Sequence, residues 1–294
     1  MVESRSLPAR LFDIFNTCLL IAITLVCFLP LWHILMLSLS DRDAINAGLV
    51  FVRPVGFNLL SYQKIISDGD FFNSFIVSVK RVVLGGFVGI ACILLTAYPL
   101  SKSSRQFPGK SILLWIMVFC MLFNGGTIPW YITMRSYKLI DNIWGLVLSG
   151  GLPTFYVIIA MNFFKNLPPS LEEAAYVDGA GPWKIFTRIF IPLSKPMIAT
   201  ILLFTIVGHW NEFFQGLVLS TKQLNYPLQT YIQQMVIPSN LSTINPDKIK
   251  EYIKLNNKSL DSAKIFIAMI PVMIVYPYLQ KYFVKGITLG SVKE

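Results

Sequence analysis

The stretch LPPSLEEAAYVDGAGPWKIFTRIFIP, residues 167–192, decides how the rest of this chain is interpreted. It is amphipathic, it is interrupted by turn residues, and it lies between two long apolar runs. Ser170 followed by Glu173 matches a capping box, in which the two side chains satisfy the first free N–H groups of a helix. The pattern therefore predicts a short helix that begins at Ser170 and carries Glu173 in its first turn.

Turn residues on both sides of this helix predict a helix–turn–helix. Pro168 and its neighbouring proline stop the preceding helix from continuing, because proline lacks a backbone N–H. Gly179 and Gly181 allow the chain to reverse, and Pro182 suits the first position of a second short helix. Two helices this small cannot bury a core of their own, so we expect the segment to dock on something else.

The composition places the whole chain in a membrane. Hydrophobic residues make up 54% of it and charged residues 14%, against about 25% charged in a soluble domain. Six stretches without Asp, Glu, Lys or Arg approach the about 20 residues that a helix needs to span a bilayer. They are residues 14–40, 82–101, 111–134, 142–164, 196–211 and 265–280. We therefore predict an all-α, multi-pass membrane protein with six transmembrane helices.

The first apolar run is too long for a signal peptide and has no cleavage site after it, so it is expected to remain as a span. An even number of spans places both termini on one side. The short loop 101–110, on the side of the termini, contains three Lys or Arg residues. The short loop 135–141, on the opposite side, contains two. This small difference favours cytoplasmic termini under the positive-inside rule. The net charge of +10 is scattered among loops, which fits membrane flanks and not nucleic acid.

Glycine and proline interrupt two of the expected spans. The run Asn124–Pro129 breaks the third, and Gly150, Gly151 and Pro153 break the fourth. Within a membrane, such breaks are tolerated only where protein or water satisfies the freed backbone groups. We therefore expect both breaks to face protein or a cavity.

Three ionisable residues stand inside expected spans. Lys80 and Arg81 lie in the second span, and Glu212 follows Trp210 and Asn211 near the end of the fifth, which we place at 196–220. A charge at that depth costs roughly 2.5–3.5 kcal/mol on insertion scales, so each needs a partner or a cavity. The cations could line a path for an anionic cargo. Alternatively, both could extend to the headgroups, or one could pair with Glu212.

Aromatic residues near the span ends leave two interpretations open. Trp130, Tyr131 and Trp210 could stack on sugar rings, or they could belong to the interfacial aromatic belt. His33 and His209 also lie in spans, where a hydrogen-bonded interior histidine is the more common role. The four cysteines all fall within spans and form no C-x-x-C pair, which indicates neither a disulfide nor a metal site.

The chain shows no motif for covalent chemistry. The segment Pro108–Ser111 resembles the end of a phosphate-binding loop, but Ser104 stands where the motif requires glycine. We identify no nucleophile elbow, zinc-protease motif or carboxylate pair, and expect no catalytic residue, no metal and no cofactor. Any energy source must therefore come from another subunit.

The opening stretch resembles the cytoplasmic coupling loop of bacterial ABC importer permeases, whose pattern is E-A-A, three residues, G, nine residues, I-x-L-P. Here the matching residues are Glu173-Ala174-Ala175, Gly179 and Ile189-Phe-Ile-Pro192. The one departure is isoleucine in place of leucine before the final proline. The span count and loop position are similar to those of the maltose-type second permease of carbohydrate importers. The runs 123–129, 208–211 and 276–286 resemble a subgroup for complex oligosaccharides, including uronic-acid ones such as those derived from alginate.

The resemblance implies a type I ABC importer permease fold and a set of partners. These are a second, homologous permease subunit, two ATP-binding subunits that hydrolyse the ATP, an extracytoplasmic solute-binding protein, and an oligosaccharide cargo. The protein would lie in the bacterial inner membrane with both termini in the cytoplasm. The coupling loop (residues 165–195) would seat on an ATPase subunit. The residues expected to dock there are Glu172, Glu173, Ala174, Ala175, Asp178, Gly179, Ile189 and Pro192.

The resemblance also organises the chain into parts. Residues 1–70 form the first span and outer loop, 71–285 the permease core, which includes the outer loop 221–262, and 286–294 a cytoplasmic tail. The residues expected along a substrate path are Lys80, Arg81, Tyr131, Trp210, Asn211 and Glu212. The alternative function is a stand-alone secondary carrier, or a membrane scaffold or sensor, whose loop only resembles the coupling motif.

Overall fold

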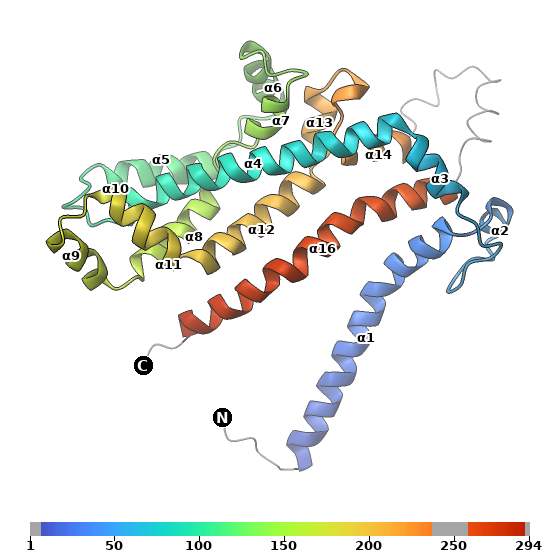
Figure 1. Ribbon diagram of the computed structural model, residues 1–294, viewed down its shortest axis with the longest axis horizontal. Helices are drawn as coiled ribbons and strands as arrows, with labels where there is room; N and C mark the ends of the chain where they lie inside the picture. Colours follow the sequence, from blue (N-terminus) through green and yellow to red (C-terminus); the bar gives the residue numbers. More distant parts are fainter. Residues whose placement is uncertain (1–6, 237–257, 292–294) are drawn as a thin grey trace. The chain divides into compact units, whose positions relative to one another are not determined.

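The computed structural model describes residues 7–236 and 258–291, and every regular element within these ranges is a helix (Figure 1). The expected all-α class is therefore confirmed. The chain divides into two compact units. The first comprises residues 1–69 and 234–270, and the second comprises 70–233 and 271–294. The outer loop 221–262 falls partly outside the described residues, which resume at Lys258.

The first unit is built on α1 (Leu7–Ser38). The short helices α2 (Arg42–Asn46) and α3 (Leu60–Ser67) follow it, and the start of α16 (Lys258–Ser291) completes the unit. The hydroxyls of Ser61 and Ser259 hydrogen-bond at 2.8 Å, and the Lys264 ammonium lies 2.8 Å from the Asp68 carboxylate. The most apolar part of α1 is not buried by any described residue. Its surface is therefore suited to lipid or to another subunit.

Among the residues that the structure describes, three helices are long and apolar enough to cross a membrane by themselves. They are α1, α4 (Gly69–Ser101) and the part Lys258–Tyr278 of α16. A helix of 33 residues such as α4 is about 50 Å long, which exceeds the about 30 Å of hydrocarbon in a bilayer. Helix α16 continues to Ser291 and so includes most of the expected tail 286–294, whose last three residues lie outside the described residues.

The third expected span is bent where its glycines predict a break. Helix α5 (Lys110–Leu122) and helix α6 (Thr127–Ser136) meet at an angle of 115°. Gly126 lies between them with φ +87°, a conformation that residues with a side chain rarely adopt. The break at Asn124–Pro129 is therefore confirmed.

The fourth and fifth expected spans are also divided into two helices each. Helix α7 (Ile143–Leu148) is followed by the glycine break and by α8 (Thr154–Lys165), as predicted. The segment 196–220, which we expected as a single span, contains two helices. Helix α12 (Lys195–Asn211) ends before Glu212, and α13 (Phe214–Leu219) begins two residues later.

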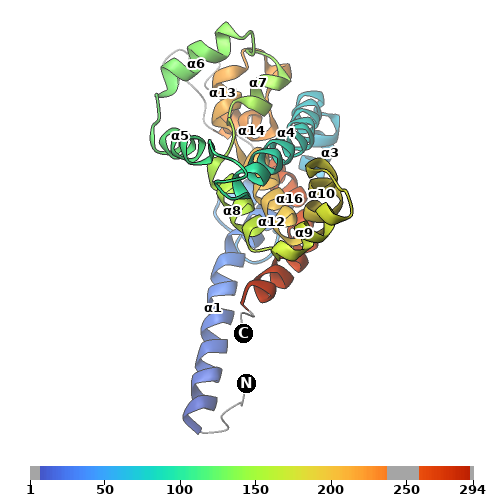
Figure 2. The same ribbon diagram turned by 90° about the vertical axis from the view of Figure 1, so that its left-hand side faces the viewer.

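The coupling loop consists of four short helical elements. They are α9 (Pro169–Val177), α10 (Pro182–Ile185), the π-helical turn η1 (Phe186–Phe190) and α11 (Ile191–Leu193). The segment Pro182–Leu193 meets α12 at 78°. Figure 1 shows α9, α10 and α11 near one end of α4, whereas α6, α7 and α13 are level with its middle part, and Figure 2 gives the same helices in a view turned by 90°.

The structure corrects the predicted start of the first loop helix. Helix α9 begins at Pro169, Pro168 occupies the N-cap, and no side chain caps the helix end. The predicted capping box of Ser170 and Glu173 is therefore wrong. The physical reason is that Pro169 fits the first helical position, where its missing N–H would have had no partner in any case. The predicted start of α10 at Pro182 is confirmed.

The end of α9 is a Schellman motif, which explains Gly179. The Ala180 N–H donates to the Ala175 carbonyl at 2.9 Å, and the Gly179 N–H donates to the Tyr176 carbonyl at 3.0 Å. Gly179 has φ +73°, the left-handed conformation that this motif requires after the helix. The predicted turn at Gly179 is confirmed.

The core of the second unit joins the transmembrane helices to the coupling loop. Its fully buried side chains come from α4, α8, α10, η1 and α12. Examples are Ala97, Ala160, Ile185 and Ile201, each fully shielded from solvent. Because the loop helices contribute side chains to this core, the loop is part of the folded unit and not an appendage.

Candidate functional site

A cavity of about 400 Å³ lies within the second unit, between α4, the break after α7, and helices α12 and α13. Apolar side chains and glycines make up much of its wall. The polar residues and the free thiol that line it are Arg81, Cys92, Tyr156, Thr205, His209, Glu212 and Gln215. The cavity is open on one side and lies among segments that the sequence places in the membrane.

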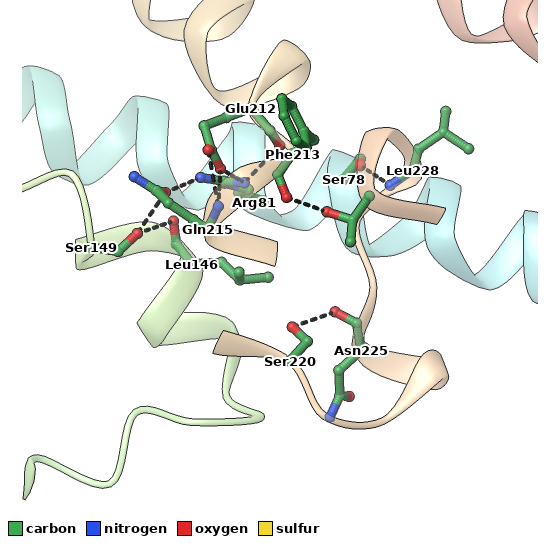
Figure 3. Close-up of polar contacts among 11 residues, drawn as sticks. Ser78, Arg81, Leu146, Ser149, Glu212, Phe213, Gln215, Ser220, Asn225 and Leu228 are labelled. Carbon is green, nitrogen blue, oxygen red and sulfur yellow. Dashed lines mark hydrogen bonds and ion pairs between the residues drawn. The ribbon is translucent and has the colours of Figure 1, made fainter. Parts of the chain in front are cut away.

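An ion pair between Arg81 and Glu212 lies in the wall of this cavity (Figure 3). The Arg81 Nη1 is 3.1 Å from the Glu212 Oε2, and it also donates to the Glu212 backbone carbonyl at 3.2 Å. Arg81 is 1% exposed and Glu212 is 26% exposed. The pair therefore offsets the cost of holding a cation at membrane depth. This is the pairing that we had considered as an alternative to a free cation.

Gln215 and Ser149 extend the ion pair into a network. The second guanidinium nitrogen of Arg81 donates to the Gln215 side-chain carbonyl. That same oxygen accepts a hydrogen bond from the Ser149 hydroxyl at 2.6 Å. Figure 3 shows these side chains converging from α4, α13 and the end of α7. The Arg81 Nε is buried and has no hydrogen-bond partner among the residues that the structure describes, so this donor is unused there.

Glu212 explains why the fifth span is divided. Both of its carboxylate oxygens accept from the Gln215 N–H, at 3.0 and 3.1 Å. Glu212 itself adopts an extended conformation (ψ 118°) at the end of α12. A carboxylate that caps the next helix and binds Arg81 cannot remain in a continuous helix, so the chain breaks here.

His209 approaches α4 closely because Gly85 has no side chain. A β-carbon at Gly85 would lie 2.5 Å from the His209 Nε2. We expected His209 to be a hydrogen-bonded interior histidine. It is interior, but its ring makes no hydrogen bond to any protein group in the described ranges, and it lines the cavity instead. The small Gly85 therefore positions a polar ring at the cavity wall.

The structure separates the residues that we expected along a path. Arg81 and Glu212 lie together at the cavity, whereas Lys80, Tyr131, Trp210 and Asn211 do not line it. Lys80 is exposed, because neighbouring residues on a helix point about 100° apart. Trp210 is buried and packs edge-on against Phe75, with 5.6 Å between ring centroids.

Sequence reasoning missed Gln215 and Tyr156 in the cavity wall, and Ser149 in the network beside it. No signal in the sequence pointed to Gln215, because its approach to Arg81 depends on the break at Glu212. Ser149 and Tyr156 gave no signal either, because both roles depend on the folding of the break after α7. We therefore place Gln215 among the functional candidates.

The coupling loop presents a second candidate surface. Glu173 and Asp178 are exposed, and their carboxylates make no hydrogen bond or ion pair within the described part of the chain. Ala174 is exposed on the same helix, whereas Ala175 is buried in the core. Ile189 is partly buried against that core, and Pro192 is exposed. Apolar side chains also face outwards here, namely Leu171, Tyr176, Val177 and Trp183, with Val177 89% exposed.

Glu172 differs from its neighbour Glu173, because it points into the protein. Its Oε2 accepts from the Lys102 ammonium at 2.7 Å, and the two side chains are 16% and 13% exposed. Glu172 thus connects α9 to the end of α4.

A hydrogen-bonded carboxylate, here called the Asp141 clamp, lies in the second unit between the third and fourth expected spans. Asp141 accepts hydrogen bonds from the Thr221 N–H at 2.8 Å, the Thr221 hydroxyl, the Lys222 N–H at 3.1 Å and the Asn225 amide at 3.1 Å. Desolvation raises the pKa of Asp141, but these hydrogen bonds outweigh it and lower that pKa to about 2. The clamp joins the turn after α6 to the segment after α13.

The apolar helices are broken at glycine and proline, and a cavity with an ion pair in its wall lies between them. A helical loop is exposed at one end. These features fit a membrane permease subunit. The comparison with protein families agrees. Residues 90–289 match the model of the binding-protein-dependent transport system inner membrane component. The chain belongs to this family, which confirms the predicted ABC importer permease and favours it over a stand-alone carrier or sensor.

Similar proteins cover almost the whole chain. Protein LplC of Bacillus subtilis (strain 168) is 38% identical over 97% of this chain and 95% of its own length. The polygalacturonan/rhamnogalacturonan transport system permease protein YtcP of the same organism is 36% identical over 97% and 99%. A subunit of a bacterial ABC transporter that imports the acidic polysaccharide alginate is 33% identical, with a TM-score of 0.84 over 95% of this chain and 98% of that subunit. The type I permease fold is confirmed.

Proposed function

We propose that this chain is one of two permease subunits that enclose the path of an oligosaccharide through the bacterial inner membrane. The cargo is an acidic oligosaccharide, such as one derived from alginate or another uronic-acid polymer. A homologous subunit supplies the other half of the path, and a solute-binding protein delivers the cargo from outside. Two ATP-binding subunits hydrolyse the ATP, and this chain carries no catalytic residue and no cofactor.

The observation that carries the cargo proposal is the buried Arg81 at the cavity. Its guanidinium has an Nε donor without a hydrogen-bond partner among the described residues, and Glu212 beside it is partly exposed to the same space. A carboxylate on a sugar ring is a natural acceptor for such a donor, because guanidinium and carboxylate geometries match. The printed names of the similar proteins support the same class of cargo, since one imports an acidic polysaccharide and another serves polygalacturonan and rhamnogalacturonan.

The coupling loop supports the proposed source of energy. Its outer surface offers Val177, Tyr176 and Trp183 next to the free carboxylates of Glu173 and Asp178. An apolar centre flanked by charges suits a protein partner. If that partner is the ATPase pair, the loop and both termini lie in the cytoplasm.

The test is uptake into proteoliposomes that contain both permeases, the ATPase pair and the solute-binding protein. We expect ATP-driven uptake of an alginate or galacturonate oligosaccharide, and no uptake of a neutral glucan of equal length. The absence of ATP-driven uptake of any sugar would contradict the permease proposal. Equal uptake of acidic and neutral sugars would contradict only the acidic cargo.

A matched pair of variants tests the role of Arg81. The double variant Arg81→Gln/Glu212→Gln removes both charges and leaves no unpaired ion in the cavity. Loss of one charge-assisted hydrogen bond, about 1.5–3 kcal/mol, lowers acidic-sugar uptake by roughly 10- to 100-fold. The control Lys80→Gln removes the adjacent exposed cation and leaves uptake unchanged. Normal uptake by the double variant would refute the assignment of Arg81.

A further inference from the structure

The last turn of α4 is held by aromatic rings of the coupling loop and of α8. The Tyr98 ring lies 4.8 Å from the Phe186 ring, 5.0 Å from the Phe190 ring and 6.2 Å from the Phe164 ring, measured between centroids. Phe186 and Phe190 are the first and last residues of η1, and Phe164 is near the end of α8. Tyr98 thus seats the end of α4 against the loop by apolar contact.

Lys102, the residue after α4, adds a polar contact at the same place. Its ammonium lies 4.1 Å from the Tyr98 ring centroid, 4.3 Å from the Phe190 ring centroid and 2.7 Å from the Glu172 carboxylate. A cation over two ring faces and against a carboxylate is attracted by all three groups. One ammonium therefore binds α4, α9 and η1 together.

The Lys102–Glu172 ion pair cannot be broken without a loss of stability. The second oxygen of Glu172, Oε1, is buried and accepts no hydrogen bond from the residues that the structure describes. Without Lys102 this carboxylate would be a largely buried charge with no counter-ion, which is strongly unfavourable. Arg105, three residues further, is exposed and makes no such contact in the described structure. The position of Lys102 is therefore specific.

Helix α4 connects this contact to the cavity. Arg81 and Cys92 line the cavity from α4, and Lys102 follows 21 residues after Arg81, about 30 Å along a helix. Helix α4 is unbroken between these points, whereas the third, fourth and fifth expected spans are divided. An unbroken helix transmits a displacement at one end to the other.

We propose that the Lys102–Glu172 pair, with Tyr98 and Phe190, is a latch that makes α4 move with the coupling loop. The latch passes the ATP-driven displacement of the loop along α4 to the Arg81–Glu212 pair in the cavity. Lys102 is a positioning residue and touches no cargo. This proposal rests on the proposed ATP-driven function and adds the element that carries the motion.

The native Cys92 provides a readout that needs no cargo. In the assembled importer, with Cys18, Cys27 and Cys120 replaced by serine, the rate of Cys92 labelling by a maleimide reports access to the cavity. We expect ATP and vanadate to change this rate in the parent protein. Lys102→Met reduces the ATP-dependent change about tenfold, as does Glu172→Gln, while ATP hydrolysis continues.

Two further variants separate a latch from a merely structural role. Lys102→Arg keeps the cation and retains most of the ATP-dependent change. The charge exchange Lys102→Glu/Glu172→Lys recovers more of that change than either single variant. Arg105→Met, the matched control, behaves as the parent. An unchanged ATP response in Lys102→Met would overturn the latch. No ATP response in the parent would instead contradict the ATP-driven function and the latch with it.

Discussion

Two ion pairs about 30 Å apart along α4 differ in their surroundings. The Arg81–Glu212 pair lies at the cavity among backbone and amide groups, with Arg81 1% exposed. The Lys102–Glu172 pair lies against two aromatic rings, with Lys102 13% exposed. The first cation has several oxygen acceptors, and the second has one carboxylate and two ring faces. Under the proposals above, the first pair lies beside the path of the cargo, and the second joins α4 to the coupling loop.

Removing Arg81 alone from the Arg81–Glu212 pair gives the largest expected loss of stability. Arg81→Gln leaves Glu212 without its cation and destabilises the subunit by about 3–5 kcal/mol. The measurement is thermal unfolding of the purified subunit in detergent. Arg81→Gln/Glu212→Gln should regain most of the loss, and Lys80→Gln should change little. An equal loss in the single and double variants would contradict this account of the pair.

Breaking the loop pair has a smaller effect that depends on salt. Glu172→Gln weakens a charge-assisted contact and costs about 1.5–3 kcal/mol at low ionic strength. Raising the salt from 0.1 to 1 M, which shortens the screening length from about 10 to 3 Å, should reduce this cost. The cost of Arg81→Gln should change less, because that cation is almost fully buried. The same salt dependence for both variants would remove the proposed difference between the pairs.

A substitution in the turn after α9 tests the coupling loop without changing either ion pair. Gly179 has φ +73° and open space around it, so a new side chain there is opposed by backbone conformation alone. Gly179→Val costs about 1–2 kcal/mol and should abolish ATP-coupled uptake while the protein still inserts in the membrane. The control is Gly181→Ala, at a glycine with φ −74° and equally open space, which should transport normally. Normal uptake in Gly179→Val would contradict the role of the loop.

Asp141 is a third carboxylate to compare with the two ion pairs. It accepts hydrogen bonds from uncharged donors instead of pairing with a cation. Because its folded pKa is about 2, below the about 3.9 of an unfolded aspartate, it stabilises the fold above pH 4. That contribution is lost as the pH falls from about 4 to 2. The stability difference between the parent and Asp141→Asn should therefore shrink across this window. The difference for Asp178→Asn, at an exposed carboxylate without hydrogen bonds, should stay near zero.

Local sequence signals predicted the breaks and the turn, because glycine and proline act through their own backbone. Gly126, Gly151 and Gly179 all adopt the positive φ that their context suggested. The predicted capping box at Ser170 is wrong because the helix begins one residue earlier, at Pro169, which suits the first helical position. The six-span count remains a prediction, since three helices have the required length and composition and the other segments are bent or short.

Tertiary approaches could not be predicted from the sequence. The sequence identified Lys102 only as a loop charge, because its partners Glu172 and Phe190 lie far away along the chain. Gln215 joined the cavity only because Glu212 interrupts the fifth span. Of two adjacent cations, the sequence could not say which faces inwards, and the fold selects Arg81 over Lys80.

The most direct test of the account is a double-mutant cycle across the length of α4. The rates of ATP-driven uptake are compared for the parent, Lys102→Met, Arg81→Gln/Glu212→Gln and the combined variant. Sites about 30 Å apart are normally additive, whereas parts of one mechanical connection are not. We predict that the combined variant loses clearly less than the sum of the two separate losses, expressed as free energies. Additive losses would show that α4 does not connect the coupling loop to the cavity.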